Sequence, residues 1–116
     1  LALRVHAETE IIPGCGPVIG ADNLVGMIET SAAKLLGNHK VSILLSASMG
    51  SEDFSFYLAK KPGAFFRIGT GMADPNSHLA LHNGKLLFSE DAILAGAVTF
   101  CGIVFLFTGS DFSILE

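Results

Sequence analysis

The chain has 116 residues, the size of one domain. Half of the residues are hydrophobic and only 16% are charged, against roughly 25% in an average soluble domain, so we expect part of the apolar surface to meet another chain or further sequence. The net charge is -4 and the seven Lys and Arg residues form no basic stripe, which argues against a nucleic-acid partner. Cys15 and Cys101 match neither a disulfide framework nor a zinc motif, so we expect a reducing, cytoplasmic setting.

The elements predicted along the chain alternate between strands and helices. Residues 1–8 alternate apolar and polar side chains, whereas residues 41–47 and 64–69 are short apolar runs between turn signals, and all three patterns are typical of strands. Residues 22–36 have helical apolar spacing, with Asp22 as the expected cap and Gly37 as the stop. A short helix over residues 51–60 and a loop over residues 70–88 complete this part. The order predicts an α/β fold, without fixing the strand order.

The last predicted helix, residues 92–107, is almost entirely apolar. Its sixteen residues fall short of the roughly 20 that a membrane-spanning helix needs, and no Trp, Tyr, Lys or Arg anchors flank it. We therefore predict a fully buried core helix and no membrane partner. A membrane span is the alternative interpretation.

The tripeptide Ser-Glu-Asp occurs twice, at residues 51–53 and 89–91. A serine in the cap position and acids in the first turn stabilise a helix start, so capping alone explains both copies. The first copy differs because it follows a predicted strand and the Met49-Gly50 turn, a position where α/β sheets place ligands. This context makes Glu52 and Asp53 candidates for a cleft.

Among the four histidines, His82 has the most informative position. It lies in the long loop directly after the apolar residues 79–81, so we expect its ring to be held against the core with one nitrogen free. Such a ring suits a metal ligand or an acid/base, but no HxH, HExxH or CxxC motif accompanies it. A plain polar role for this histidine remains the alternative at this point.

Two stretches, MGSEDFSFYLAKKPGAFFRIG at residues 49–69 and LHNGKLLFSEDAILAGA at residues 81–97, resemble the carboxyl-terminal part of the M20 family of metal-dependent amidohydrolases and peptidases. The similarity is greatest to the branch that hydrolyses N-acyl-amino acids, hippurate and indole-acetyl-amino acids. It covers about the last two thirds of the chain closely, and residues 3–13 and 22–37 more loosely.

The resemblance implies a catalytic α/β domain, with a mixed sheet flanked by helices, that a smaller lid domain interrupts. Residues 1–10 would be the exit strand of the lid, and residues 11–116 the carboxyl-terminal part of the catalytic domain. The complete protein would form a homodimer through the lid. The 116 residues would then be a fragment of a longer metallo-amidohydrolase.

The resemblance also implies two divalent metal ions, zinc or manganese, that activate water and polarise the amide carbonyl of a small N-acyl-amino acid or peptide. His82 matches the metal ligand that the carboxyl-terminal segment supplies. Gly50, Glu52 and Asp53 match a motif near the site and would contact the substrate or support the ligands. The general base and the other ligands would lie outside this chain, so we expect no catalytic residue among the 116 and no activity from them alone.

Two other functions remain open from the sequence. The chain is compatible with a non-catalytic module, derived from such a hydrolase, that depends on a partner to cover its apolar surface. A small membrane protein anchored through residues 92–107 is the second alternative.

Overall fold

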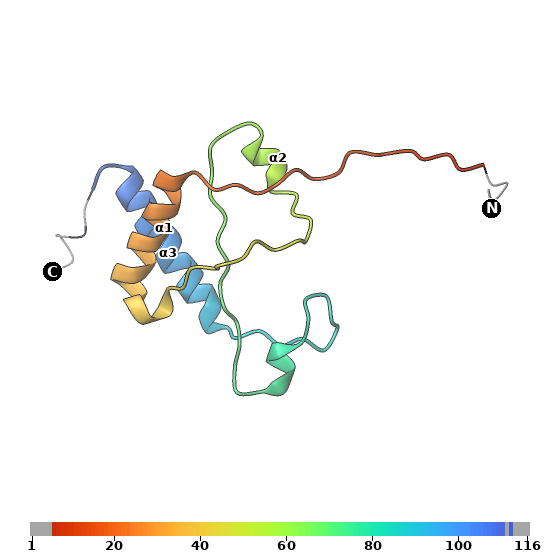
Figure 1. Cartoon of the computed structure of the whole chain (residues 1–116). Coiled ribbons are helices and arrows are strands. Elements are labelled where there is room, and N and C mark those ends of the chain that lie inside the picture. Colours follow the sequence, from red (N-terminus) through yellow and green to blue (C-terminus); the bar gives the residue numbers. More distant parts are fainter. Residues whose placement is uncertain (1–5, 111, 113–116) are drawn as a thin grey trace.

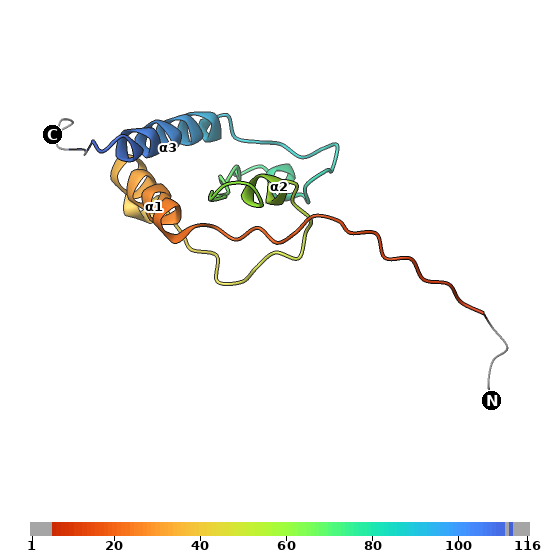
Figure 2. The ribbon, with the colours of Figure 1, turned by 90° about the horizontal axis from the view of Figure 1, so that it is seen from above.

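The structure is a computed structural model that describes residues 6–110 and 112. It contains three α-helices, α1 (Asp22–Leu36), α2 (Ser55–Leu58) and α3 (Asp91–Phe107), and two short helical turns, η1 (Asn38–Lys40) and η2 (Pro75–His78). Figures 1 and 2 show α1 and α3 side by side at one end, with long irregular segments looping away from them. The described residues therefore form one helix pair with extended connections.

The predicted mixed sheet is wrong, because the described residues contain no strand. A strand needs a neighbour that accepts and donates its backbone hydrogen bonds, and residues 41–47 and 64–69 have no such neighbour in the described part of the chain. The side chains of Ile43, Leu44 and Leu45 are 70%, 67% and 99% exposed. In the strand predicted at residues 1–8, residues 1–5 lie outside the described range and residues 6–8 are irregular.

The helix predicted at residues 22–36 is confirmed as α1. Its cap differs from the prediction, because Ala21 occupies the N-cap position without a side-chain cap and Asp22 is the first helical residue. The backbone N–H of Ala21 donates to the carbonyl of Gly63 at 2.9 Å, which ties the helix start to the segment after α2. The helix ends at Gly37, whose φ of 98° is a conformation that glycine adopts without strain.

The contact between α1 and α3 is built from small side chains. Ser31 on α1 is fully buried, and its hydroxyl donates to the carbonyl of Thr99 at 2.8 Å. A Cβ atom on Gly102 would overlap the Ser31 hydroxyl and lie 2.7 Å from Cδ1 of Leu35. The helices approach this closely because Gly102 has no side chain.

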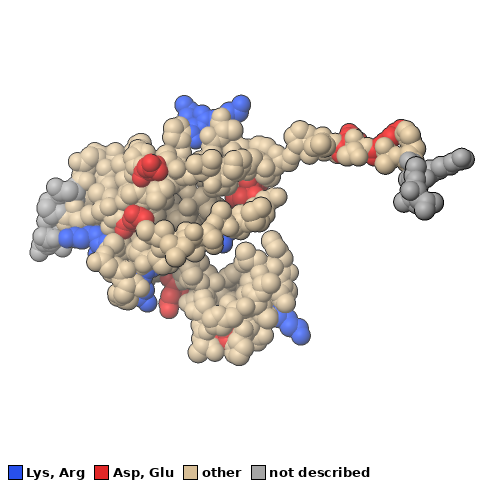
Figure 3. Space-filling view, viewed as in Figure 1, with Lys and Arg blue, Asp and Glu red and all other residues tan. Residues whose placement is uncertain are grey.

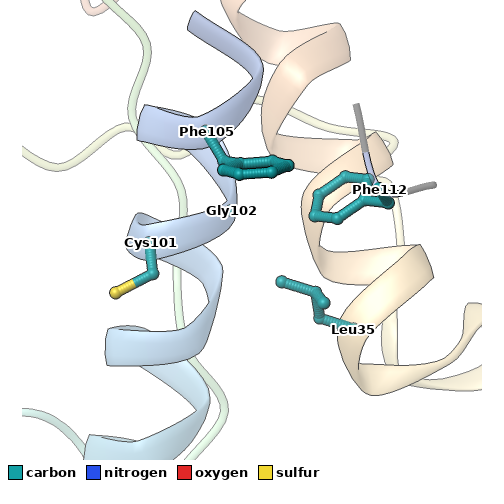
Figure 4. Close-up of a pocket in the computed structure, with 5 residues that line it drawn as sticks. All are labelled: Leu35, Cys101, Gly102, Phe105 and Phe112. Atoms are coloured by element: carbon teal, nitrogen blue, oxygen red, sulfur yellow. The ribbon is translucent and has the colours of Figure 1, made fainter. Parts of the chain in front are cut away.

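A small apolar pocket lies near the carboxyl end of the helix pair. The pocket has a volume of about 160 Å³ and is lined by Leu35, Cys101, Gly102, Phe105 and Phe112. Figure 4 shows the Cys101 side chain pointing away from the other side chains. The rings of Phe105 and Phe112 lie 5.7 Å apart. Phe112 is 8% exposed, so it covers the end of the pair.

The helix predicted over residues 92–107 is confirmed as α3, but its predicted full burial is wrong. Only one face packs on α1. On the other face Ile93 is 75%, Val104 61% and Phe107 70% exposed. Within the described range, no helix meets the length and hydropathy that a membrane crossing requires.

Candidate functional site

The first Ser-Glu-Asp segment forms a tight turn ahead of α2. The predicted serine cap is wrong here: α2 begins only at Ser55, and the carboxylate of Glu52 accepts the backbone N–H of Phe54 at 3.2 Å. Glu52 is half-buried, whereas Gly50 and Asp53 are exposed. The turn thus uses one Glu52 oxygen for structure and leaves the Asp53 carboxylate in solvent.

An aromatic cluster behind this turn fixes its position. The ring of Phe54 lies 5.9 Å from that of Tyr57 and 5.7 Å from that of Phe65. Gly63 closes the cluster, because a Cβ atom there would lie 2.7 Å from Cδ2 of Leu58. Ser55, which is 5% exposed, has a hydroxyl without a hydrogen-bond partner in the described part of the chain.

The outer side of α2 carries a shallow basic surface. Phe56, Tyr57, Lys60 and Lys61 line an open depression of about 320 Å³. Figure 3 shows basic side chains gathered at the edge of the molecule where α2 lies. None of these residues was singled out from the sequence, since two adjacent lysines carry no motif.

The second Ser-Glu-Asp segment has a purely structural place in the fold. The predicted Ser89 side-chain cap is wrong: Glu90 is the N-cap of α3 and makes no side-chain hydrogen bond to the helix. The Ser89 backbone instead donates to the carbonyl of Thr70 at 3.0 Å and accepts from Ala92 at 3.2 Å. These bonds join the base of the long loop to the start of α3.

Residues 70–88, predicted as a loop, are irregular apart from η2, and a hydrogen bond between Thr70 and Ser89 closes the loop at its base. Inside the Thr70–Ser89 closure, the backbone of Leu87 donates to the carbonyl of Asn76 at 3.2 Å. The buried Ser77 hydroxyl lies 2.7 Å from the carbonyl of Asp74 and 2.8 Å from the N–H of Met72, so it holds η2 against the preceding chain. The loop is therefore a hydrogen-bonded platform for the residues at its tip.

His82 lies at that tip with a left-handed backbone. Its φ is 69°, and among the described residues it is the only one other than glycine with a positive φ. The turn is closed by the N–H of Asn83, which donates to the carbonyl of Ala80 at 3.2 Å, and by the N–H of Lys85, which donates to Oδ1 of Asn83 at 2.9 Å. Such conformations cost free energy and concentrate at functional sites.

The environment of the His82 ring differs from the sequence-based expectation. The residue is exposed rather than held against the core. His78 in the same loop places Nε2 2.9 Å from the carbonyl of Met72, whereas the His82 ring makes no hydrogen bond to the described residues. Of these two histidines, His82 has both ring nitrogens available. The sequence carried a signal for the turn in His82-Asn83-Gly84, three residue types that tolerate left-handed backbone.

The structure does not bring the predicted site residues together. Figure 1 shows α2 and the loop that follows η2 at opposite ends of the long segment between them. In the described part of the chain, no three His, Cys, Asp or Glu residues group closely enough to hold a metal ion. The described residues alone therefore do not fit a metal centre, and among them His82 is available as a single ligand.

Comparison with known proteins identifies the family of the chain. The model of a family described as peptidase family M20/M25/M40 matches residues 5–105, a range that includes Glu52, Asp53 and His82. The chain belongs to peptidase family M20/M25/M40. Members of this M20 family generally depend on metal ions.

A relative supports the same conclusion. Over 73 residues the M20 chain is 38% identical to a protein of Synechocystis sp. (strain ATCC 27184 / PCC 6803 / Kazusa) that is named a probable hydrolase. The match covers 63% of this chain and 19% of that protein, so the chain spans only about a fifth of its relative's length. No solved structure shows a significant match.

Proposed function

We propose that the complete protein hydrolyses the amide bond of N-acyl-amino acids or small peptides with the help of two divalent ions, zinc or manganese. The match to the M20 family over residues 5–105 carries this proposal. Within that range the chain contributes His82 as one metal ligand and the turn of residues 50–53 as part of the cleft. When bound, such ions polarise the carbonyl and lower the pKa of a water molecule.

The proposed role of His82 rests on how its loop presents it. A left-handed histidine persists only where the surrounding structure compensates for its strain, and here the Thr70–Ser89 and Asn76–Leu87 hydrogen bonds close the loop behind it. The neutral imidazole is the commonest metal ligand in proteins, and this ring is exposed with both nitrogens available.

The turn of residues 50–53 has a supporting role in this proposal. One carboxylate oxygen of Glu52 orders the turn through the N–H of Phe54, and the exposed Asp53 adds negative charge beside it. Gly50 leaves room for close approach, because a Cβ atom there would meet only the Ser48 hydroxyl, at 3.6 Å. These groups would orient substrate or ligands rather than bind the metal directly.

The larger organisation follows from the same family relationship. We propose that residues 1–10 leave a lid domain, that residues 11–116 belong to the catalytic domain, and that the complete protein is a cytoplasmic homodimer joined through the lid. The general base and the other ligands would then come from outside these 116 residues. On its own the chain would be inactive, and robust chelator-sensitive hydrolysis of N-acyl-amino acids by the purified 116-residue chain would contradict this proposal.

The variant His82→Gly tests the role of His82 in the complete protein. Glycine relieves the left-handed backbone, so we expect the loop to be as stable as before or slightly more stable. Hydrolysis of an N-acetyl-amino acid should nevertheless fall at least about 100-fold, and bound metal should decrease, because a ligand is lost. Activity assays, metal analysis and thermal unfolding measure the three effects.

The matched control is His39→Gly, which removes an exposed histidine of η1 outside the loop. This variant should keep its activity and metal content. If His82→Gly kept full activity and metal while gaining stability, His82 would be only a turn residue and its assignment would fail.

A second candidate function, a non-catalytic module that depends on a partner, is favoured by the exposed apolar side chains of residues 43–45 and of α3. The mass of the intact gene product separates the two proposals. A longer protein that contains further His, Asp or Glu ligands supports the hydrolase, whereas an intact product of 116 residues supports the module.

A further inference from the structure

The chain exposes far more surface than a folded protein of its size. Its accessible surface is 9882 Å², whereas a compact monomer of 12.2 kDa exposes about 6,100 Å². The radius of gyration is 19.8 Å, against about 13 Å for a compact domain of this length. About 3,800 Å² of surface is thus left over for contact with something else.

The most regular part of this surface is one face of α3. The face toward α1 is formed by the buried residues Thr99 and Gly102. Beside it, the segment that follows α2 packs on α3, because Gly96 lies against Ile68 and the ring of Phe100 lies 5.2 Å from that of Phe66. The opposite face, which we call the outer stripe, has exposed apolar residues alternately four and three positions apart: Ile93, Ala97, Phe100, Val104 and Phe107. This spacing aligns them along one side of a helix, as in helices that pack on both sides.

The composition of the outer stripe indicates what it can bind. It contains no charged or polar side chain, and residues 91–107 contain only one charged residue, Asp91 in the first turn. Figure 3 shows that most of the visible face of the molecule carries no charge either. A nucleic acid or a charged peptide finds no counter-charge on such a stripe. An apolar protein surface needs no counter-charge and can pack against it.

We propose that the outer stripe is the surface through which this segment packs against the remaining part of a longer hydrolase chain, so that α3 becomes an inner helix between α1 and that part. This inference rests on the proposed function, since it requires that the complete protein is longer. The matched relative is long enough to supply the cover, because the aligned 73 residues are only 19% of it.

The amount of exposed surface favours this occupant over a second copy of the chain. A standard protein–protein interface removes about 800 Å² from each partner. The surplus here is about 3,800 Å², several times that value, and it extends beyond α3 to Ile43, Leu45 and Met49. A large continuous cover, such as the rest of a domain, accounts for this surplus, and a dimer formed through α3 alone does not.

Cys101 provides a direct test, because it is exposed and follows Phe100 on the edge of the outer stripe. With Cys15→Ser as the background, we would measure the rate at which a maleimide labels Cys101 in the 116-residue chain and in the complete protein. We expect labelling to be at least about 100-fold slower in the complete protein, because the maleimide then reaches Cys101 only when a packed region opens. Equal labelling rates would overturn the proposal.

The variant pair Ala97→Asp and Ala73→Asp tests the same surface without relying on cysteine. Both alanines are exposed in the described structure, but only Ala97 lies on the outer stripe. In the complete protein Ala97→Asp should accelerate Cys101 labelling at least tenfold and lower the unfolding temperature, while Ala73→Asp should change neither. Equal effects of the two variants would contradict the assignment of the stripe.

Two further outcomes separate the alternatives. Protection of Cys101 that depends on protein concentration, with a doubled mass, would show a second copy on the stripe and would overturn the proposal. A protected Cys101 in a longer protein without hydrolase activity would contradict the proposed function and support the packing role of the stripe.

Discussion

The α1–α3 pair and the loop of residues 70–89 are both held by few hydrogen bonds, but the bonds act in different surroundings. In the helix pair, the Ser31–Thr99 bond joins two residues that are 0% and 3% exposed. In the loop, the bonds of Asp74 and Asn83 connect exposed residues to their near neighbours. The pair depends on steric fit between distant parts of the sequence, whereas the loop depends on hydrogen bonds within residues 70–89.

This difference predicts how each region responds to substitution. A change in the helix pair alters contacts that no solvent molecule can replace, so its effect on the free energy of unfolding should be large. In the loop, water can take the place of a lost partner, so the effect should be small and local.

The largest effect should come from Gly102→Ala. The added Cβ atom would overlap the Ser31 hydroxyl and press on Leu35, and overpacking of this kind costs up to about 3 kcal/mol. The higher helix propensity of alanine offsets about 1 kcal/mol of this cost, so we expect the free energy of unfolding to fall by about 2 kcal/mol. Urea denaturation, monitored by circular dichroism, measures this change.

Gly26→Ala is the matched control on α1, because nothing lies within 4 Å of its added Cβ atom. This variant should gain up to about 1 kcal/mol from helix propensity alone. If both alanines stabilised the protein equally, the close approach of α1 and α3 would not exist in solution.

Ser31→Ala should have a smaller effect. It removes the 2.8 Å hydrogen bond to the carbonyl of Thr99 inside the helix contact, and the loss of such a bond costs about 1 kcal/mol. Thr30→Ala is the control, since the Thr30 hydroxyl bonds only to Gly26 of its own helix and is exposed. Its effect should stay within about 0.5 kcal/mol. A Thr30 variant as destabilised as the Ser31 variant would show that burial is not the cause.

The sequence predicted α1 and α3 well because their signals are local. Apolar spacing and Gly37 mark α1, and an almost wholly apolar run that follows Asp91 marks α3, whatever surrounds these helices. The strands were wrong because an apolar run such as residues 41–47 indicates only a capacity to pair, and pairing needs a neighbour at a distant position. The full burial predicted for α3 failed for the same reason, since hydropathy does not show which face has a partner.

The candidate site divides in a similar way. The sequence placed His82 in a loop, but its left-handed backbone depends on the hydrogen bonds that close residues 70–89 and was not predicted. Glu52 was predicted near a helix start, yet its own carboxylate, rather than the Ser51 hydroxyl, accepts the backbone N–H. Both details depend on hydrogen-bond geometry that residue type alone leaves open.

The smallest effect should come from Asp74→Ala in the loop. Oδ1 of Asp74 accepts the N–H of Asn76 at 2.8 Å at the start of η2, and at an exposed site the loss of a cap costs as little as about 0.5 kcal/mol. Because the residue is exposed, we expect the change as faster amide hydrogen exchange at Asn76 and Ser77, with α1 unaffected. Asp74→Asn keeps an acceptor oxygen and should exchange almost as slowly as the original protein. If Asp74→Ala accelerated exchange in α1 as much as in η2, the loop and the helix pair would unfold as one unit, and the distinction between a locally held loop and a sterically fitted pair would be lost.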